Sequence, residues 1–120
     1  MRHDDAAQCF TELGHATRLS IYRLLVKSGE KGMTVGEIQN ALKIPASTLS
    51  HHVSRLARVR LIKQSRTGRE LVCQPISSRL EHLINYLQVK YSNSLDRNKN
   101  IKKHNNKSNK NKILESAVIT

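Results

Sequence analysis

The chain has 120 residues and a formal net charge of +12, with 21 Lys and Arg against nine Asp and Glu. This length accommodates one domain, and no stretch approaches the roughly 18 consecutive apolar residues of a membrane-spanning helix. The two cysteines are too few for a disulfide framework. We therefore expect a cytoplasmic protein with reduced thiols and an anionic partner, nucleic acid before a membrane or an acidic protein.

The excess positive charge is confined to two stretches of the chain. Seven basic residues and no acidic residue lie between Lys43 and Arg69, and residues 96–120 carry a further excess of five. Residues 96–112 are almost entirely Asn, Lys, Ser and His, so they cannot bury enough apolar surface to offset the entropy lost on ordering. We predict a folded domain over residues 1–95 and a basic, disordered tail over residues 96–120.

Helical spacing of apolar residues predicts two helices at the start of the chain. The first extends from about residue 4 to Gly14, and the second covers residues 16–28 and ends at Ser28-Gly29. The predicted core-facing stripe of the second helix contains Leu19, Tyr22 and Val26, widened by Ile21, Leu24 and Leu25.

Two further helices follow, separated by a short break. Thr34-x-x-Glu37 is a capping box that opens a helix ending at Leu42. Pro45 favours a new helix start, and the next helix is predicted over 46–59. Its inward face contains Leu49, Val53 and Leu56, spaced i, i+4 and i+7. Two short helices with a tight break have the dimensions of a helix-turn-helix.

A β-hairpin and a last helix complete the predicted elements. Strands are expected over 61–65 and 70–74, joined by a turn at Gly68. The last helix begins at Ser77 or Ser78, and its apolar stripe contains Leu80, Leu83, Ile84, Leu87 and Tyr91. The resulting fold class is mainly α with a small β-hairpin wing, in the order α-α-α-α-β-β-α. This order is a winged helix-turn-helix.

The basic stretch covers the second helix of this motif and the wing. Recognition helices present their first residues to the major groove, where short hydrogen-bonding side chains reach base edges and phosphates. Basic side chains at a wing tip suit the DNA backbone or the minor groove. The predicted DNA contacts are Ser47, Thr48, Ser50, His51 and Arg55 on the helix, with His52 as a further candidate, and Arg66 and Arg69 on the wing.

Catalytic and metal-binding patterns are missing from the sequence. It contains no Gly-rich phosphate loop, no His-x-x-x-His pair and no Cys-x-x-Cys pair. His51 and His52 are adjacent on a predicted helix and would point about 100° apart, which disfavours joint metal binding. We therefore expect neither an enzyme nor a cofactor or metal.

Two segments resemble the ArsR/SmtB family of winged-helix bacterial repressors. Leu13-Gly14-His15-Ala16-Thr17-Arg18-Leu19 resembles the entry into the family's second helix, with Ala16 in place of Pro. Ser47-Thr48-Leu49-Ser50-His51-His52-Val53-Ser54-Arg55-Leu56 resembles its recognition helix. Val59-Arg60 stands where many members have Ala-Gly. The resemblance implies a homodimer that represses transcription at a DNA operator and is released by an inducer. It places the dimer interface on the first and last helices, at Phe10, Leu80, Leu83, Leu87 and Tyr91.

The residues that bind inducers in the family are replaced by other residue types in this sequence. The thiolate positions of the third helix are Thr34 and Gly36, and the zinc-ligand positions of the last helix are Ser77, Arg79, Lys90 and Asn93. Cys9 and Cys73 are the remaining candidates for sensing. Three roles are open for them: two buried thiols without a sensing role, a redox or thiol-reactive sensor, or ligands of arsenic or a soft metal. An alternative function is a sensorless winged-helix module that binds DNA without sequence preference or binds an acidic protein.

Overall fold

The structure is a computed structural model that describes residues 1–96, with side chains described as far as Gln88. Residues 1–86 form one compact unit, and Leu87 begins a second unit. The predicted basic tail over 96–120 therefore lies outside the described residues, apart from Asp96. None of the helices in the described part is long and apolar enough to cross a membrane.

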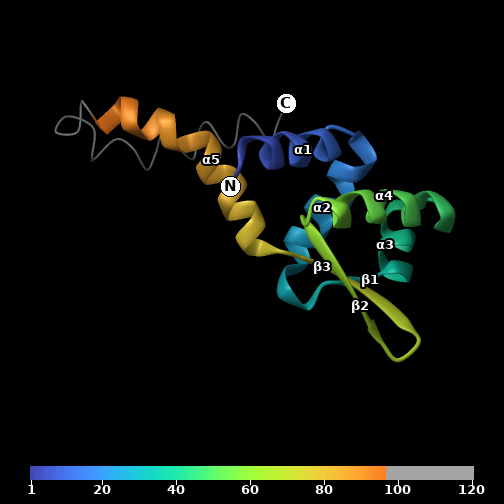
Figure 1. The fold of residues 1–120 in the computed structure, drawn as a ribbon. Coiled ribbons are helices and arrows are strands. Elements are labelled where there is room, and N and C mark those ends of the chain that lie inside the picture. The colour runs from blue at the N-terminus through green and yellow to red at the C-terminus, as the bar shows by residue number, and fades with distance from the viewer. Residues whose placement is uncertain (97–120) are drawn as a thin grey trace. The chain divides into compact units, whose positions relative to one another are not determined.

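Two helices begin the fold, at the positions the sequence predicts (Figure 1). Helix α1 covers His3–Leu13 and α2 covers Ala16–Ser28, followed by the 3-10 turn η1 at Gly29–Lys31. His15 is the N-cap of α2, because its Nδ1 atom accepts a hydrogen bond from the Thr17 amide at 3.2 Å. This contact satisfies one of the free amides at the helix start.

The helix-turn-helix follows a strand that the sequence did not predict. Strand β1 is only two residues long, Met33–Thr34, and leads into α3 at Val35–Leu42. The predicted capping box is confirmed: the Thr34 hydroxyl accepts from the Glu37 amide, and the Glu37 carboxylate accepts from the Thr34 amide, each at 3.1 Å. Helix α4 covers Ala46–Arg58, one residue shorter than predicted.

The wing is a hairpin of β2 at Ile62–Thr67 and β3 at Glu70–Pro75. Both strands are antiparallel to their neighbours, and the sheet order is β1-β3-β2. Strand β3 is therefore central, and it joins the wing to the strand that precedes α3. Strand β2 begins one residue later and ends two residues later than the sequence predicts, and β3 ends one residue later.

Helix α5 covers Ser77–Asp96 and leaves the hairpin directly. In the compact unit its Leu83 side chain is buried, and Leu80 packs against the core. The core joins α1, α2, α3, α4, the wing and the start of α5. Its members are Ala6, Cys9, Ile21, Tyr22, Leu25, Ile38, Leu49, Val53, Leu56, Val59, Leu61, Ile62, Cys73 and Leu83.

The predicted stripe of α2 is wrong at two positions. Leu19 and Val26 are 43% and 41% exposed, whereas Ile21, Tyr22 and Leu25 are buried. Helix α2 packs on α1, α3, α4 and β3. The buried face of α2 is therefore set by several neighbouring elements and not by one periodic stripe.

Candidate nucleic-acid interface

Helix α4 has one buried face and one polar face. Leu49, Val53 and Leu56 are fully or almost fully buried, as predicted. Ser47, Thr48, Ser50 and His51, which are among the predicted DNA contacts, are exposed on the first turns of the helix. The packed face fixes the orientation of α4, so these four side chains are presented to solvent in a defined arrangement.

The turn between α3 and α4 is tight and regular. Lys43 adopts a left-handed conformation (φ 53°, ψ 48°) and its amide donates to the Gln39 carbonyl at 2.7 Å, which ends α3. Pro45 is extended and its carbonyl accepts from the Leu49 amide at 3.0 Å, which starts α4. The helix-turn-helix predicted from the sequence is therefore present.

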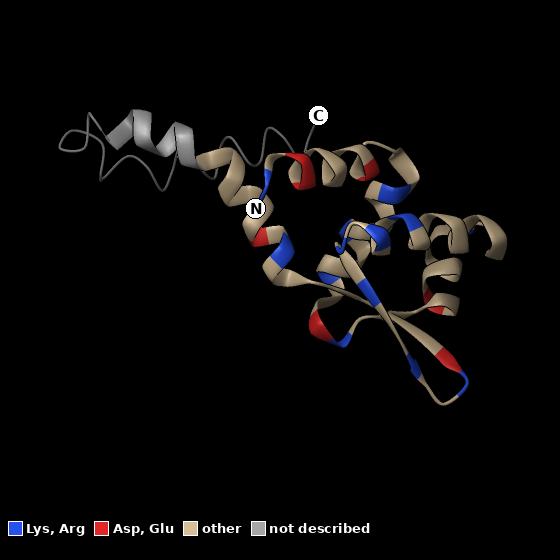
Figure 2. Ribbon diagram, in the orientation of Figure 1, with Lys and Arg blue, Asp and Glu red and all other residues tan. Residues whose placement is uncertain are grey.

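The wing brings its basic residues to an exposed tip. Gly68 has a positive φ of 64°, which glycine accepts without strain, and it turns the chain between Thr67 and Glu70. Arg66 and Arg69 are both exposed. Figure 2 shows basic segments on the wing strands and at the tip, beside the acidic start of β3.

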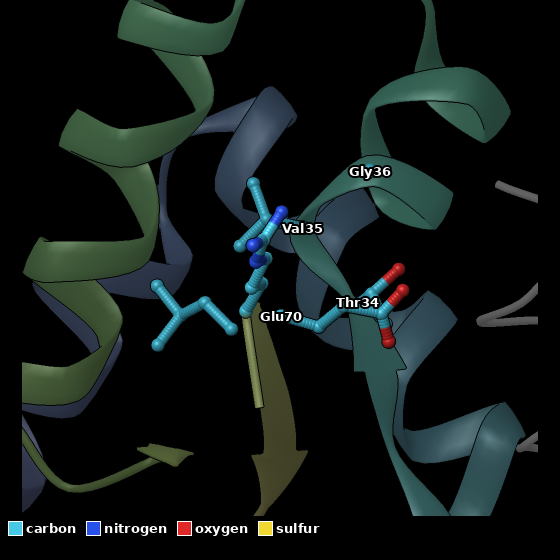
Figure 3. Close-up of a pocket in the computed structure, with 6 residues that line it drawn as sticks. Thr34, Val35, Gly36 and Glu70 are labelled. Atoms are coloured by element: carbon cyan, nitrogen blue, oxygen red, sulfur yellow. The ribbon is translucent and has the colours of Figure 1, made fainter. Parts of the chain in front are cut away.

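A shallow pocket of about 370 Å³ lies between the wing and the start of α3 (Figure 3). It is lined by Thr34, Val35, Gly36, Arg69, Glu70 and Leu71. Arg69 of the wing and the capped N-terminus of α3 therefore border the same hollow. The wing and the helix-turn-helix form one continuous surface at this point.

Arg55, the remaining predicted DNA contact on α4, is held by Glu12 of α1. The Glu12 carboxylate accepts from Arg55 Nε at 2.8 Å and from Nη2 at 3.0 Å. The Arg55 side chain is 36% exposed, so it lies at the margin of the polar face. The hydrogen bonds from Arg55 also lower the pKa of Glu12 below its ordinary value. No motif in the sequence around Glu12 predicts this contact, because Glu12 and Arg55 are 43 residues apart.

His52 does not belong to the exposed face, which corrects its inclusion as a further DNA contact. Its side chain is buried, and its Nδ1 atom lies 3.2 Å from Arg18 Nη1. The rings of His15 and His51 pack against it, with ring centroids 4.6 Å and 5.5 Å away. Burial, with the neighbouring His15 and Arg18 charges, lowers the pKa of His52 below its ordinary 6.5.

The predicted dimer residues fall into three groups. Phe10 and Leu87 are 40% and 60% exposed, as an interface between copies would need. Leu83 is 3% exposed and belongs to the protomer core, and Leu80 is half-buried against that core. Leu83 therefore stabilises the protomer itself, in contrast to its predicted place in the interface. The side chain of Tyr91 lies outside the described residues.

Both cysteine thiols are fully buried. Cys9 Sγ donates to the Val59 carbonyl at 3.7 Å, and burial raises the pKa of both thiols. Of the three roles left open for them, this environment matches two buried thiols, because a reactive cysteine needs access and a stabilised thiolate. In residues 1–96 no three His, Cys, Asp or Glu side chains converge as metal ligands.

Sequence comparison connects this geometry to known regulators. Residues 13–65, which contain α2 to α4 and most of β2, match the helix-turn-helix domain family. The chain is 36% identical over 67 residues to an HTH-type transcriptional regulator of Methanocaldococcus jannaschii, covering 56% of this chain and 73% of that protein. It is 31% identical over 87 residues to the transcriptional repressor PagR of Bacillus anthracis, covering 72% and 85%.

Solved structures show the same fold. An ArsR-like transcriptional regulator from Rhodococcus superposes with a TM-score of 0.66 at 19% identity, over 83% of this chain and 94% of that one. A homodimeric winged helix-turn-helix domain from Mycobacterium bovis, a possible ArsR-family regulator, superposes with a TM-score of 0.59 at 25% identity, over 74% and 80%. The two sequence relatives, with the Mycobacterium bovis domain, show that the chain belongs to the ArsR-like winged helix-turn-helix family of DNA-binding transcriptional regulators.

Proposed function

We propose that this regulator is a homodimeric repressor that binds operator DNA through α4 and the wing and leaves it when an inducer binds. The observation that carries the proposal is the division of α4, which buries Leu49, Val53 and Leu56 and exposes its polar first turns. The DNA contacts we assign are Ser47, Thr48, Ser50, His51 and Arg55 on α4, and Arg66 and Arg69 on the wing.

Repression and dimerisation are supported by the relatives and by the exposed apolar residues. PagR is named as a transcriptional repressor, and the Mycobacterium bovis domain is homodimeric. Phe10 and Leu87 offer exposed apolar surface on α1 and α5. A dimer would present two copies of α4 to the two halves of a pseudo-palindromic site. We propose a binding function without catalysis, exerted in the cytoplasm.

The test is the salt dependence of binding to the DNA upstream of the chain's own gene. Removing one phosphate contact lowers the slope of log affinity against log salt by about one unit. We expect this change in Arg66→Ala and in Arg69→Ala, and an unchanged slope in Arg23→Ala, since Arg23 is exposed on α2. Unchanged slopes in both wing variants contradict the assignment.

The same experiment separates the repressor from the sensorless module. A repressor binds its operator more tightly than unrelated competitor DNA of equal length, because base contacts add to the phosphate contacts. A module without sequence preference binds both DNAs equally, and a module that binds an acidic protein binds neither DNA.

A further inference from the structure

The buried polar and charged side chains of the described residues gather in one cluster. They are Glu12 of α1, Arg18 of α2 and His52 of α4. The cluster joins α1 and α2, which precede the helix-turn-helix motif, to α4, the predicted recognition helix. A buried charge is tolerated when it is paired and hydrogen-bonded. The partners of each charged group in this cluster therefore decide how it is held.

Glu12 is the centre of the cluster. Its carboxylate accepts two hydrogen bonds from Arg55, and its Oε2 atom lies 3.5 Å from Arg18 Nε. Arg18 Nε also donates to the Glu12 backbone carbonyl at 2.7 Å. A guanidinium that donates from two nitrogens to both oxygens of a carboxylate is fixed in plane and in direction. Glu12 therefore sets the orientation of the Arg55 side chain.

The two hydrogen bonds from Arg55 to Glu12, which we call the Glu12 clamp, use two of the three guanidinium nitrogens. Nε and Nη2 of Arg55 bond to Glu12, and among the described residues nothing bonds to Nη1. The side chain is 36% exposed. The unused nitrogen can therefore take an acceptor from outside the protein, while the other two keep the group from rotating.

We propose that Glu12 is a positioning residue for DNA binding, which holds Arg55 so that Nη1 meets a phosphate of the operator in one orientation. The inference rests on the proposed function, because it takes α4 as the helix that contacts DNA. It assigns to α1 a direct effect on the DNA surface, through a carboxylate that itself touches no DNA.

Glu12 has two effects on DNA binding, and they have opposite signs. A carboxylate near a DNA surface repels phosphates, so its removal by charge alone would strengthen binding. Arg18 and Arg55 neutralise this carboxylate within 4 Å, however, so its field at the DNA is small. The positioning effect should prevail, and Glu12→Gln should weaken operator binding about tenfold, the factor that corresponds to one charged contact.

The experiment is a double-mutant cycle of Glu12→Gln and Arg55→Gln, measured by fluorescence anisotropy on a labelled operator fragment. If Glu12 acts through Arg55, Glu12→Gln weakens DNA binding in the original chain. In a chain that already carries Arg55→Gln, the same substitution has no further effect on binding. Glu30→Gln is the matched control, since it removes the same charge from an exposed residue of η1. Circular dichroism of each variant confirms that equal amounts of folded protein are compared.

The outcomes are distinguishable. The positioning role is overturned if the Glu12→Gln variant binds DNA as tightly as the Glu30→Gln variant. It is also overturned if Glu12→Gln weakens binding equally in the original chain and in the chain with Arg55→Gln. If the unchanged chain gives no discrete binding to any upstream DNA, the proposed function fails and the inference with it. If Glu12→Gln does not fold, Arg55→Lys tests the same clamp, because Lys keeps the charge and lacks the fork. A loss of about tenfold is then expected, and full affinity overturns the inference.

Discussion

Gly29 and Gly32 have nearly the same backbone conformation, but the space around Gly29 is open and the space around Gly32 is filled. Their φ and ψ angles are 76° and −158°, and 71° and −165°, in a region that only glycine occupies readily. A Cβ atom at Gly32 would lie 2.2 Å from the Cys73 carbonyl oxygen and 2.6 Å from Gln74 Cγ. A Cβ atom at Gly29 would meet nothing within 4 Å. The pair therefore separates backbone strain from steric conflict.

The two substitutions to alanine should differ in magnitude. Backbone strain costs about 1–3 kcal/mol at either position. At Gly32 the conflicting oxygen belongs to the backbone of β3, the central strand, which pairs with β1 at Met33 and Cys73. Displacing packed atoms of this kind adds about 1–3 kcal/mol. Gly32→Ala should therefore lower the free energy of unfolding by roughly twice as much as Gly29→Ala.

Urea unfolding followed by circular dichroism measures both values, with Gly36→Ala as a control. Gly36 lies in α3, where a Cβ would lie 3.9 Å from the Thr34 hydroxyl and the backbone is helical, so alanine should not destabilise the chain there. Equal losses for Gly29→Ala and Gly32→Ala would refute the steric argument. No loss for Gly29→Ala would refute the strain argument.

Three further predictions concern the cluster around His52, the thiols and α5. Because burial lowers the pKa of His52 below 6.5, the unfolded chain binds that proton at a higher pH; the free energy of unfolding should fall as the pH drops through 6.5 toward the folded pKa. Urea titrations across this range should show a flatter dependence for His52→Gln, and an unchanged dependence contradicts the assignment. A thiol reagent should label neither Cys9 nor Cys73 until denaturant is added, and rapid labelling of the native protein would disprove their inertness. Leu83→Ala should cost about 2–4 kcal/mol of unfolding free energy, whereas Ile84→Ala, at a residue 44% exposed, should mainly weaken self-association in sedimentation velocity. The reverse pattern would place Leu83 in the interface.

Helix α4 could be predicted from the sequence because its information is local. Leu49, Val53 and Leu56 recur at helical spacing within a single amphipathic helix, and Thr34 with Glu37 forms a motif three residues apart. The buried face of α4 leaves its first polar residues exposed. The candidate DNA surface follows from that pattern, together with the wing.

The Glu12 clamp and strand β1 could not be predicted in this way. Glu12 and Arg55 are 43 residues apart, and nothing in the neighbourhood of either residue shows that they meet. Strand β1 has two residues, too few to display alternation, and exists because β3 pairs with it. Contacts of this kind depend on how the elements pack in three dimensions.

Arg60 departs from the family pattern at the turn from α4 to the wing. Its φ is 61°, a conformation that favours glycine, and many members of the family have Gly at this position. The turn from α4 to the wing is formed all the same, with the Arg60 amide donating to the Ala57 carbonyl at 3.0 Å. The departure from the family pattern therefore changes the local strain and leaves the turn in place.

The most direct test of the account is hydroxyl-radical footprinting of the full chain on the DNA upstream of its own gene, with unlabelled competitor. A dimer with α4 in the major groove should protect two half-sites about one helical turn apart. Arg66→Ala combined with Arg69→Ala should weaken that protection at equal protein concentration. Protection spread evenly along the fragment, or a footprint unchanged by the two wing substitutions, would contradict the claim that α4 and the wing form an operator-binding surface.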